Sequence, residues 1–173
     1  MSSTTLMPAS DYVKTYIDGG ARPQAEYVDG RLLPKGMGTR KHSRIQRRLL
    51  ELLGAYRKFE AFPELHARLR EREFRIPDII VEQKPVLDEA YPAQPVYLCI
   101  EILSPDQTLQ QLFDKCERYH AWGTAYCWVI DPEEPAAWEY HQNGQPDLRP
   151  AAEALAAGEI SLPVVEIFSV LAD

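Results

Sequence analysis

Two hydrophobic runs in the middle of the chain predict neighbouring buried strands. Residues 96–103 are apolar or β-branched except for Glu101, a composition typical of a strand covered on both faces. Residues 74–81 are also strand-like, but Pro77 cannot donate a ladder hydrogen bond, so we expect a bulge or a sheet edge next to it. The intervening segment 83–95 is long enough for the chain to turn and return alongside.

A helix is predicted directly after the second of these strands. Ser104 is suited to the N-cap, Pro105 to the first helical position and Gln107 to a capping box. Apolar side chains then recur at three- and four-residue spacing as far as Gly123. At about 100° per residue, Lys115 lies at the edge of this stripe. It can therefore keep its head in solvent or lean back towards the strand's end.

The first third of the chain predicts a helix, a hairpin and a second helix. We expect a short helix near 10–17, followed by strands at 25–28 and 31–33 around an Asp29-Gly30 turn. A longer amphipathic helix begins near residue 40, because apolar residues repeat on one of its faces.

The last third contains further strand signals. Residues 126–130 predict a buried strand and 136–141 an edge strand, whereas 146–158, rich in Ala and Pro, predicts a loop or a weak helix. Residues 164–171 fit a strand or a helix equally well. Strands on both sides of the central helix favour an α/β (α+β) fold, a mixed central β-sheet flanked by helices.

Composition is that of an ordinary globular protein. With 173 residues, 45% hydrophobic and 26% charged, the chain is expected to form a single domain, 1–173. Its three cysteines have no metal-binding spacing and are interpreted as buried, reduced thiols of a cytoplasmic protein. Neither a signal peptide nor a membrane span is indicated, since no apolar run approaches 18 residues.

The charge of the chain is unevenly distributed. A net charge of −7 argues against a protein that coats nucleic acid generally. One predicted helix nevertheless carries a basic cluster that could follow DNA phosphates or be an ordinary solvated face, namely Arg40, Lys41, Arg44, Arg47 and Arg48. Three further arginines alternate along the strand-like segment 67–74, where they would share one face.

Asp78 and Glu101 are the candidate metal ligands. If the two predicted strands are neighbours and both acids point to one side, their repulsion is about 4 kcal/mol at 4 Å and an effective dielectric of 20. A divalent cation would turn that repulsion into attraction. Carboxylates suit Mg²⁺ or Mn²⁺, and no thiolate or paired-histidine pattern for zinc is present.

A series of short motifs resembles the PD-(D/E)XK nuclease superfamily and, within it, the Uma-two family of restriction-endonuclease-like proteins. Each motif is weak alone, but their order is fairly specific. They are Glu26-Tyr27-Val28-Asp29-Gly30-Arg31, His42, Arg75-Ile76-Pro77-Asp78, Glu101-Ile102-Leu103-Ser104-Pro105, Asp114-Lys115, Tyr119 and Trp128-Val129-Ile130-Asp131-Pro132.

The resemblance implies a restriction-endonuclease-like core with a metal, Mg²⁺ or Mn²⁺, held by Asp78 and Glu101. The backbone carbonyl of Ile102 would also be in reach of the ion. The superfamily usually has a lysine two residues after the glutamate, where this chain has Leu103. The resemblance therefore assigns the catalytic cation to Lys115 on the following helix.

Two further side chains enter the site only through the resemblance. It places Glu26 and His42 at the metal cleft, whereas the residues alone are equally consistent with an exposed cross-strand glutamate and a surface histidine. Tyr126 stands where members of the family often carry an acid, so a third carboxylate ligand is not assured.

Two classes of function follow. The first is a metal-dependent endonuclease that hydrolyses DNA phosphodiesters. The second is a catalytically inactive module of the same fold that binds nucleic acid or protein. The full set of Asp78, Glu101 and Lys115 favours the enzyme. Target sequence, strand preference and oligomeric state, a homodimer included, are left open.

Overall fold

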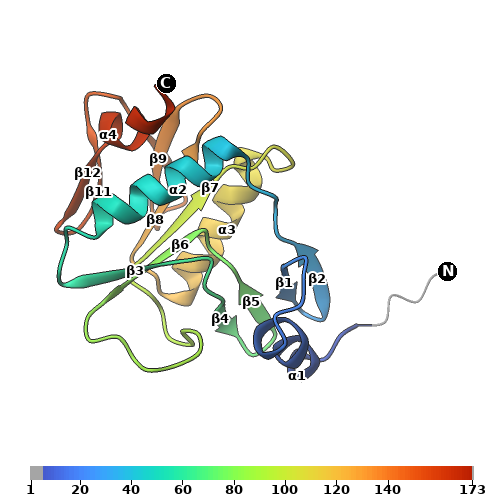
Figure 1. Cartoon of the computed structure of the whole chain (residues 1–173). Coiled ribbons are helices and arrows are strands. Elements are labelled where there is room, and N and C mark those ends of the chain that lie inside the picture. Colours follow the sequence, from blue (N-terminus) through green and yellow to red (C-terminus); the bar gives the residue numbers. More distant parts are fainter. Residues whose placement is uncertain (1–5, 173) are drawn as a thin grey trace.

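A six-stranded mixed sheet forms the centre of the computed structural model, which describes residues 6–172 (Figure 1). The order across the sheet is β10-β9-β8-β7-β6-β3. Only β7 and β8 pair in parallel, and a helix joins them. The strands are β3 (Phe59–Pro63), β6 (Ile79–Gln83), β7 (Leu98–Ile102), β8 (Tyr126–Asp131), β9 (Ala136–Tyr140) and β10 (Pro146–Arg149).

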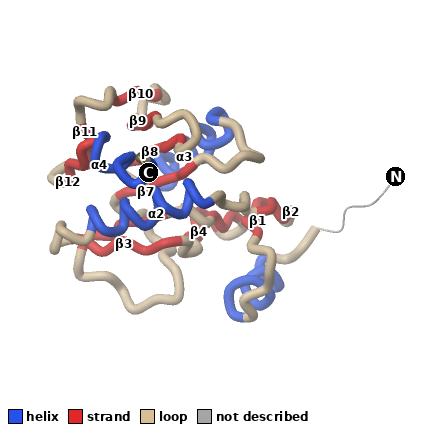
Figure 2. Tube along the Cα trace, turned by 45° about the horizontal axis from the view of Figure 1, so that its top comes forward, coloured by secondary structure: helices blue, strands red, loops and turns tan. Residues whose placement is uncertain are grey.

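Two helices cover the two faces of this sheet (Figure 2). The apolar side of α2 (Arg40–Leu53) packs on Ile79 and Ile100, whereas that of α3 (Leu109–Trp122) packs on Ile80 and Cys99. Side chains alternate between the faces of a strand, so residues 78 and 101 belong to the face covered by α3. This alternation places both candidate acids on the same side of the sheet.

A smaller sheet, β2-β1-β5-β4, lies beside the first one. Its strands are β1 (Ala25–Val28), β2 (Arg31–Pro34), β4 (Ala67–Arg70) and β5 (Glu73–Arg75). The N-terminal α1 (Ala9–Tyr12) continues as a π-helix (Val13–Asp18), and its Tyr12 packs against Tyr27 and Phe74 of this sheet. The sheet thus brings Glu26 of β1 towards the main sheet.

The C-terminal part closes the face covered by α2. The hairpin of β11 (Ala154–Ala157) and β12 (Ile160–Pro163) leads into α4 (Val164–Phe168) and a 3₁₀ turn (Ser169–Leu171). Their apolar side chains join the same core cluster as α2. Within residues 6–172 no helix combines the length and the apolar character needed to cross a membrane.

Several expectations are confirmed. The mixed sheet with flanking helices, the N-terminal helix, the 25–33 hairpin and the strand within 96–103 are present. The central helix α3 ends at its C-cap Gly123, as expected. All three cysteines are buried and free.

Four expectations about element boundaries are wrong. The central helix begins at Leu109, with Thr108 and Gln111 forming its capping box, and Ser104–Gln107 is a separate turn. Residues 74–81 form two strands in different sheets, because the chain leaves one sheet at Pro77 and enters the other.

The other two corrections concern hairpins. Residues 67–74 fold as the hairpin of β4 and β5, so Arg68, Arg70 and Arg72 do not lie along one strand. Residues 146–158 are strands β10 and β11, which makes β10 the sheet edge in place of β9. Residues 164–171 are helical.

Candidate functional site

The two acids lie opposite each other on neighbouring antiparallel strands. Ile79 pairs with Ile100, so the same register places Asp78, directly before β6, across from Glu101. Both are buried, at 2% and 1% exposure. Oδ2 of Asp78 accepts the backbone N–H of Ile102 at 2.6 Å. The carboxyl group of Asp78 is therefore fixed to the end of β7, beside Glu101.

Three side chains hold the other parts of Asp78. The Lys35 Nζ lies 2.9 Å from its Oδ1 and the His42 Nε2 lies 3.4 Å from the same oxygen. The Nε2 of Gln46 donates to the backbone carbonyl of Asp78 at 2.9 Å. Burial acts to raise the pKa of Asp78, but Lys35, His42 and the Ile102 N–H outweigh it and hold that pKa well below its usual range.

Glu101 is contacted by a tyrosine and a lysine from α3. Tyr119 donates its hydroxyl to Oε1 at 2.5 Å, and the Lys115 Nζ lies 3.0 Å from that oxygen. Burial, with added repulsion from Asp78 and Glu26, raises the pKa of Glu101 in spite of Lys115. Burial and the neighbouring acids thus destabilise the charged form of Glu101. An additional cation nearby would stabilise that charged form.

Glu26 connects the small sheet to this centre. Its Oε1 lies 2.9 Å from the Lys115 Nζ and accepts the N–H of Ile76 at 2.9 Å, while Oε2 lies 3.2 Å from Arg75. Burial acts to raise the pKa of Glu26, but Lys115, Lys35 and Arg75 outweigh it and lower the pKa. Lys115 therefore bridges two carboxylates, one from each sheet.

A cleft of about 570 Å³ leads to the site from the side of α3 and β2. Glu26, Arg75, Lys115 and Arg118 line it, whereas Asp78 and Glu101 are not among its lining residues. The acid pair thus lies behind Glu26 and Lys115. The lining of the cleft carries both signs of charge, because three further acids line it as well, namely Asp106, Asp114 and Glu117.

The donor chemistry fits a hard divalent cation. Carboxylate oxygens of Asp78 and Glu101 are the ligands that Mg²⁺ and Mn²⁺ prefer, and a cation already occupies this environment in the form of the Lys35 ammonium. The contact that Ile102 makes at Asp78 uses its N–H. A metal contact by its carbonyl stays a prediction.

The structure brings six sequence-selected residues together: Asp78, Glu101, Lys115, Glu26, His42 and Ile102. The alternatives in which Glu26 and His42 are surface residues are wrong, because these residues are 5% and 4% exposed. Lys35 and Gln46 were missed, since the sequence has no pattern that marks them, and Arg75 was quoted in a motif but given no role. Lys35 simply follows the hairpin between a proline and a glycine.

The basic residues of α2 lie away from the acid pair. At 100° per residue, Arg40, Arg44 and Arg47 lie on the opposite side of the helix from His42 and Gln46. Three of the five basic residues reach acids: Lys41 at 2.9 Å from Glu133, and Arg47 and Arg48 within 3.8 Å of Glu51. Within residues 6–172, Arg40 and Arg44 have no carboxylate at ion-pair distance.

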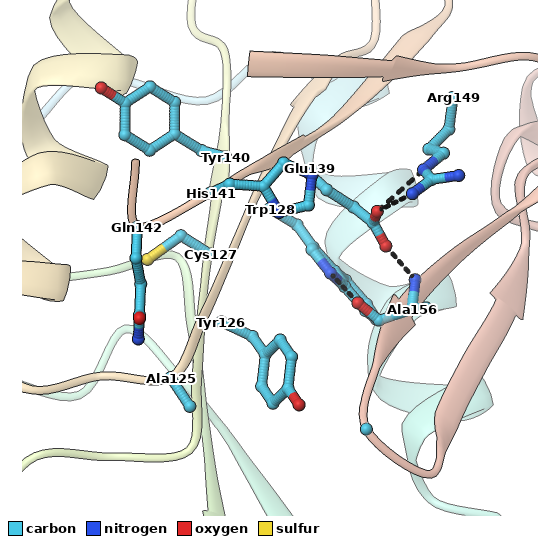
Figure 3. A pocket seen from close by; sticks show the side chains of 11 residues that line it. Ala125, Tyr126, Cys127, Trp128, Glu139, Tyr140, His141, Gln142, Arg149 and Ala156 are labelled. Atoms are coloured by element: carbon cyan, nitrogen blue, oxygen red, sulfur yellow. Dashed lines mark hydrogen bonds and ion pairs between the residues drawn. The ribbon is translucent and has the colours of Figure 1, made fainter. Parts of the chain in front are cut away.

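A second group of ligand-type side chains lies at β9 and β10 (Figure 3). Glu139, His141 and Asp147 offer atoms within 4.8 Å of one another, the one such trio in the described part of the chain. Arg149 already bonds to Glu139 through two nitrogens and lies 3.0 Å from Asp147. Glu139 also accepts the N–H of Ala156 at 2.6 Å. This group holds the β11 hairpin against β9, beside a pocket of about 480 Å³.

Comparisons with known proteins concern the family and the fold of the chain. The family model described as "Uma2: Putative restriction endonuclease" matches residues 9–169. A crystal structure of a putative nuclease belonging to DUF820 from Anabaena variabilis superposes with a TM-score of 0.81. It is 24% identical, and the match covers 95% of this chain and 99% of that chain, which shows the shared fold. No curated protein matches the chain.

Proposed function

The chain belongs to the Uma2 family of putative restriction endonucleases, and we propose on this premise that it is a metal-dependent endonuclease acting on DNA. The observation that carries the proposal is the pairing of Asp78 with Glu101 on one face of the sheet, with the Lys115 ammonium 3.0 Å from Glu101. Asp78 and Glu101, together with the carbonyl of Ile102, would hold Mg²⁺ or Mn²⁺.

Each side chain has a distinct task in this proposal. The ion, when bound, supplies a water of lowered pKa and stabilises charge on the phosphate. Lys115 lines both the cleft and the acid pair, so it offsets negative charge on a phosphate that enters. Glu26 and Tyr119 fix Lys115 and Glu101 in place, and His42 does the same for Asp78. Preorganised groups of this kind need no rearrangement during the reaction.

DNA is the proposed substrate, and α2 is proposed to contact its backbone. Arg40 and Arg44 are the strongest candidates because neither is neutralised by a nearby carboxylate, whereas Lys41, Arg47 and Arg48 each share an acid. Contacts of this type position the duplex without reading its sequence.

One observation favours a second candidate, a non-catalytic DNA-binding module. Both acids are almost fully buried, and lysines already lie at ion-pair distance from each of them. In that case the ion pairs would serve only to stabilise the fold.

Plasmid cleavage separates the two candidates. We expect supercoiled plasmid to be nicked or linearised in millimolar Mg²⁺ or Mn²⁺, and left intact in EDTA. Glu101→Gln should abolish cleavage, whereas Asp147→Asn, a matched change at the second acidic group, should leave it unchanged.

Two outcomes would overturn the endonuclease proposal. One is cleavage that persists in purified Glu101→Gln. The other is intact plasmid under every metal condition while the protein still binds DNA in a salt-dependent manner, which would establish the binding module.

A further inference from the structure

Lys35 is a buried cation that the proposed chemistry does not use. It follows β2 directly, and its side chain is 9% exposed. Its ammonium donates to the carbonyl of Ile76 at 2.5 Å and lies 2.9 Å from Oδ1 of Asp78. A lysine this deeply buried is rare unless it is paired, and the partner of Lys35 is a proposed metal ligand.

The two oxygens of Asp78 are not equivalent. Oδ2 is engaged by the backbone N–H of Ile102 at 2.6 Å, a contact that belongs to the strand and cannot easily leave. Oδ1 is therefore the oxygen left to a metal. Lys35 contacts this oxygen at 2.9 Å, and the His42 Nε2 is farther from it, at 3.4 Å. An ion bound to Oδ1 at about 2.1 Å would lie close to an ammonium on the same atom.

Two cations on one oxygen repel each other strongly inside a protein. The backbone of Lys35 is anchored, because its N–H donates to Gln24 at 3.0 Å, so its side chain is the part that can move. Its chain neighbours Pro34 and Gly36 both line the cleft, which gives a displaced ammonium space to enter.

We propose that Lys35 is a resident counter-cation that competes with the divalent metal for Oδ1 of Asp78, so that its ammonium must leave before the metal binds there. This inference rests on the proposed function, since it takes Asp78 as a metal ligand. It assigns Lys35 to control of metal affinity, as a positioning residue outside the catalytic set.

Calorimetric titration with Mn²⁺ in the absence of DNA tests this directly. Lys35→Met should bind Mn²⁺ at least about tenfold more tightly than the unchanged protein, the order expected for removing a charge a few ångströms from the ion. Lys41→Met is the matched control, because it removes the same charge at an exposed position and should leave the affinity unchanged.

A second variant, Lys35→Gln, keeps the test valid if the first variant fails to fold. If Lys35→Met unfolds because Asp78 is left unpaired, Lys35→Gln keeps a hydrogen-bond donor and should show the same tightening. Circular dichroism before each titration shows which variant is folded.

The possible failures are distinguishable. If Mn²⁺ binds the unchanged protein through Asp78, as judged by loss of binding in Asp78→Asn, but binds the folded Lys35 variant no more tightly, Lys35 does not compete and only this inference falls. Equal tightening in Lys41→Met would overturn it as well, by showing a general charge effect. If no protein binds Mn²⁺, the proposed metal site and this inference fall together.

Discussion

Asp78 and Glu101 are each held by a lysine, whereas Glu73 and Glu139 are each held by arginines. Arg149 engages Glu139 through two nitrogens. Glu73 is fully buried and receives Arg70, Arg75 and Arg118 at 2.7 to 3.2 Å. All four acids are thus neutralised inside the protein, but by different kinds of cation.

Whether a lysine or an arginine holds a buried acid indicates where the protein can accommodate a ligand. A guanidinium is a rigid fork that matches a carboxylate with two parallel hydrogen bonds, whereas an ammonium is a compact charge on a flexible stem. Arginine-held acids are therefore suited to fastening elements together, as Glu139 does for the β11 hairpin. A lysine can leave its acid and turn to a phosphate, and the acid can then take a metal as its partner.

Removal of Lys115 should give the largest effect. We expect Lys115→Ala to lower the rate of DNA cleavage about 100- to 1000-fold, the usual loss for one preorganised electrostatic group, without any loss of Mn²⁺ binding. Single-turnover cleavage and calorimetry measure the two quantities. Lys58→Ala, at an exposed lysine, is the control. Cleavage at the unchanged rate would place Lys115 with the structural cations.

Removal of an arginine-held acid should affect stability and leave metal binding intact. Glu139→Ala should lower the free energy of unfolding by about 1.5–3 kcal/mol, because charge-assisted hydrogen bonds to Arg149 and Ala156 are lost. Asp147→Ala, whose side chain is 45% exposed, should change it by less than about 0.5 kcal/mol. Urea denaturation provides both values. Loss of Mn²⁺ binding in Glu139→Ala would break the distinction between the two kinds of acid.

Glu73 gives the pH dependence expected of an arginine-held acid. Burial acts to raise its pKa, but Arg118, Arg70 and Arg75 outweigh it and lower the pKa to about 2. A depressed pKa contributes stability that is present above the unfolded value near 4.5 and is lost as pH falls towards 2. The free energy of unfolding of Glu73→Gln should therefore depend less on pH between about 4.5 and 2. If the free energy of unfolding changes equally with pH in the unchanged protein and in Glu73→Gln, this role of Glu73 is refuted.

The smallest effect is expected from arginines on the surface of α2. Replacing Arg40 and Arg44 by alanine should reduce the slope of log affinity for DNA against log salt by about one unit each. The matched control replaces Arg57 and Lys58, exposed residues just beyond the C-terminal end of the same helix. An identical slope in the α2 variant would assign these arginines to solubility.

The sequence was sufficient for the strand that carries Glu101, because this acid interrupts an apolar run. For Asp78 it predicted one strand over 74–81, whereas the chain changes sheet at Pro77. It was less reliable for the helix start. Ser104–Gln107 and Thr108–Gln111 both match the capping-box spacing, and only the second caps the helix. The first forms an isolated turn, in which Ser104 donates its N–H to the side chain of Gln107.

Features that depend on distant contacts could not be predicted. Residues 146–158 have weak strand propensity. Arg149 and the backbone N–H of Ala156 both donate to Glu139 and hold these strands in place. Lys35 lies 43 residues from Asp78 along the chain, so no local spacing links the two. Of the two lysines that hold the acid pair, the family resemblance indicates Lys115, whereas Lys35 emerges only from the folded structure.

A crystal soaked in Mn²⁺ and measured for anomalous scattering tests the central claim most directly. We expect an anomalous peak bound by the carboxylates of Asp78 and Glu101, with the Lys35 ammonium displaced from Oδ1 of Asp78. A peak at Glu139, His141 and Asp147 instead, or no peak at the acid pair at saturating Mn²⁺, would contradict it.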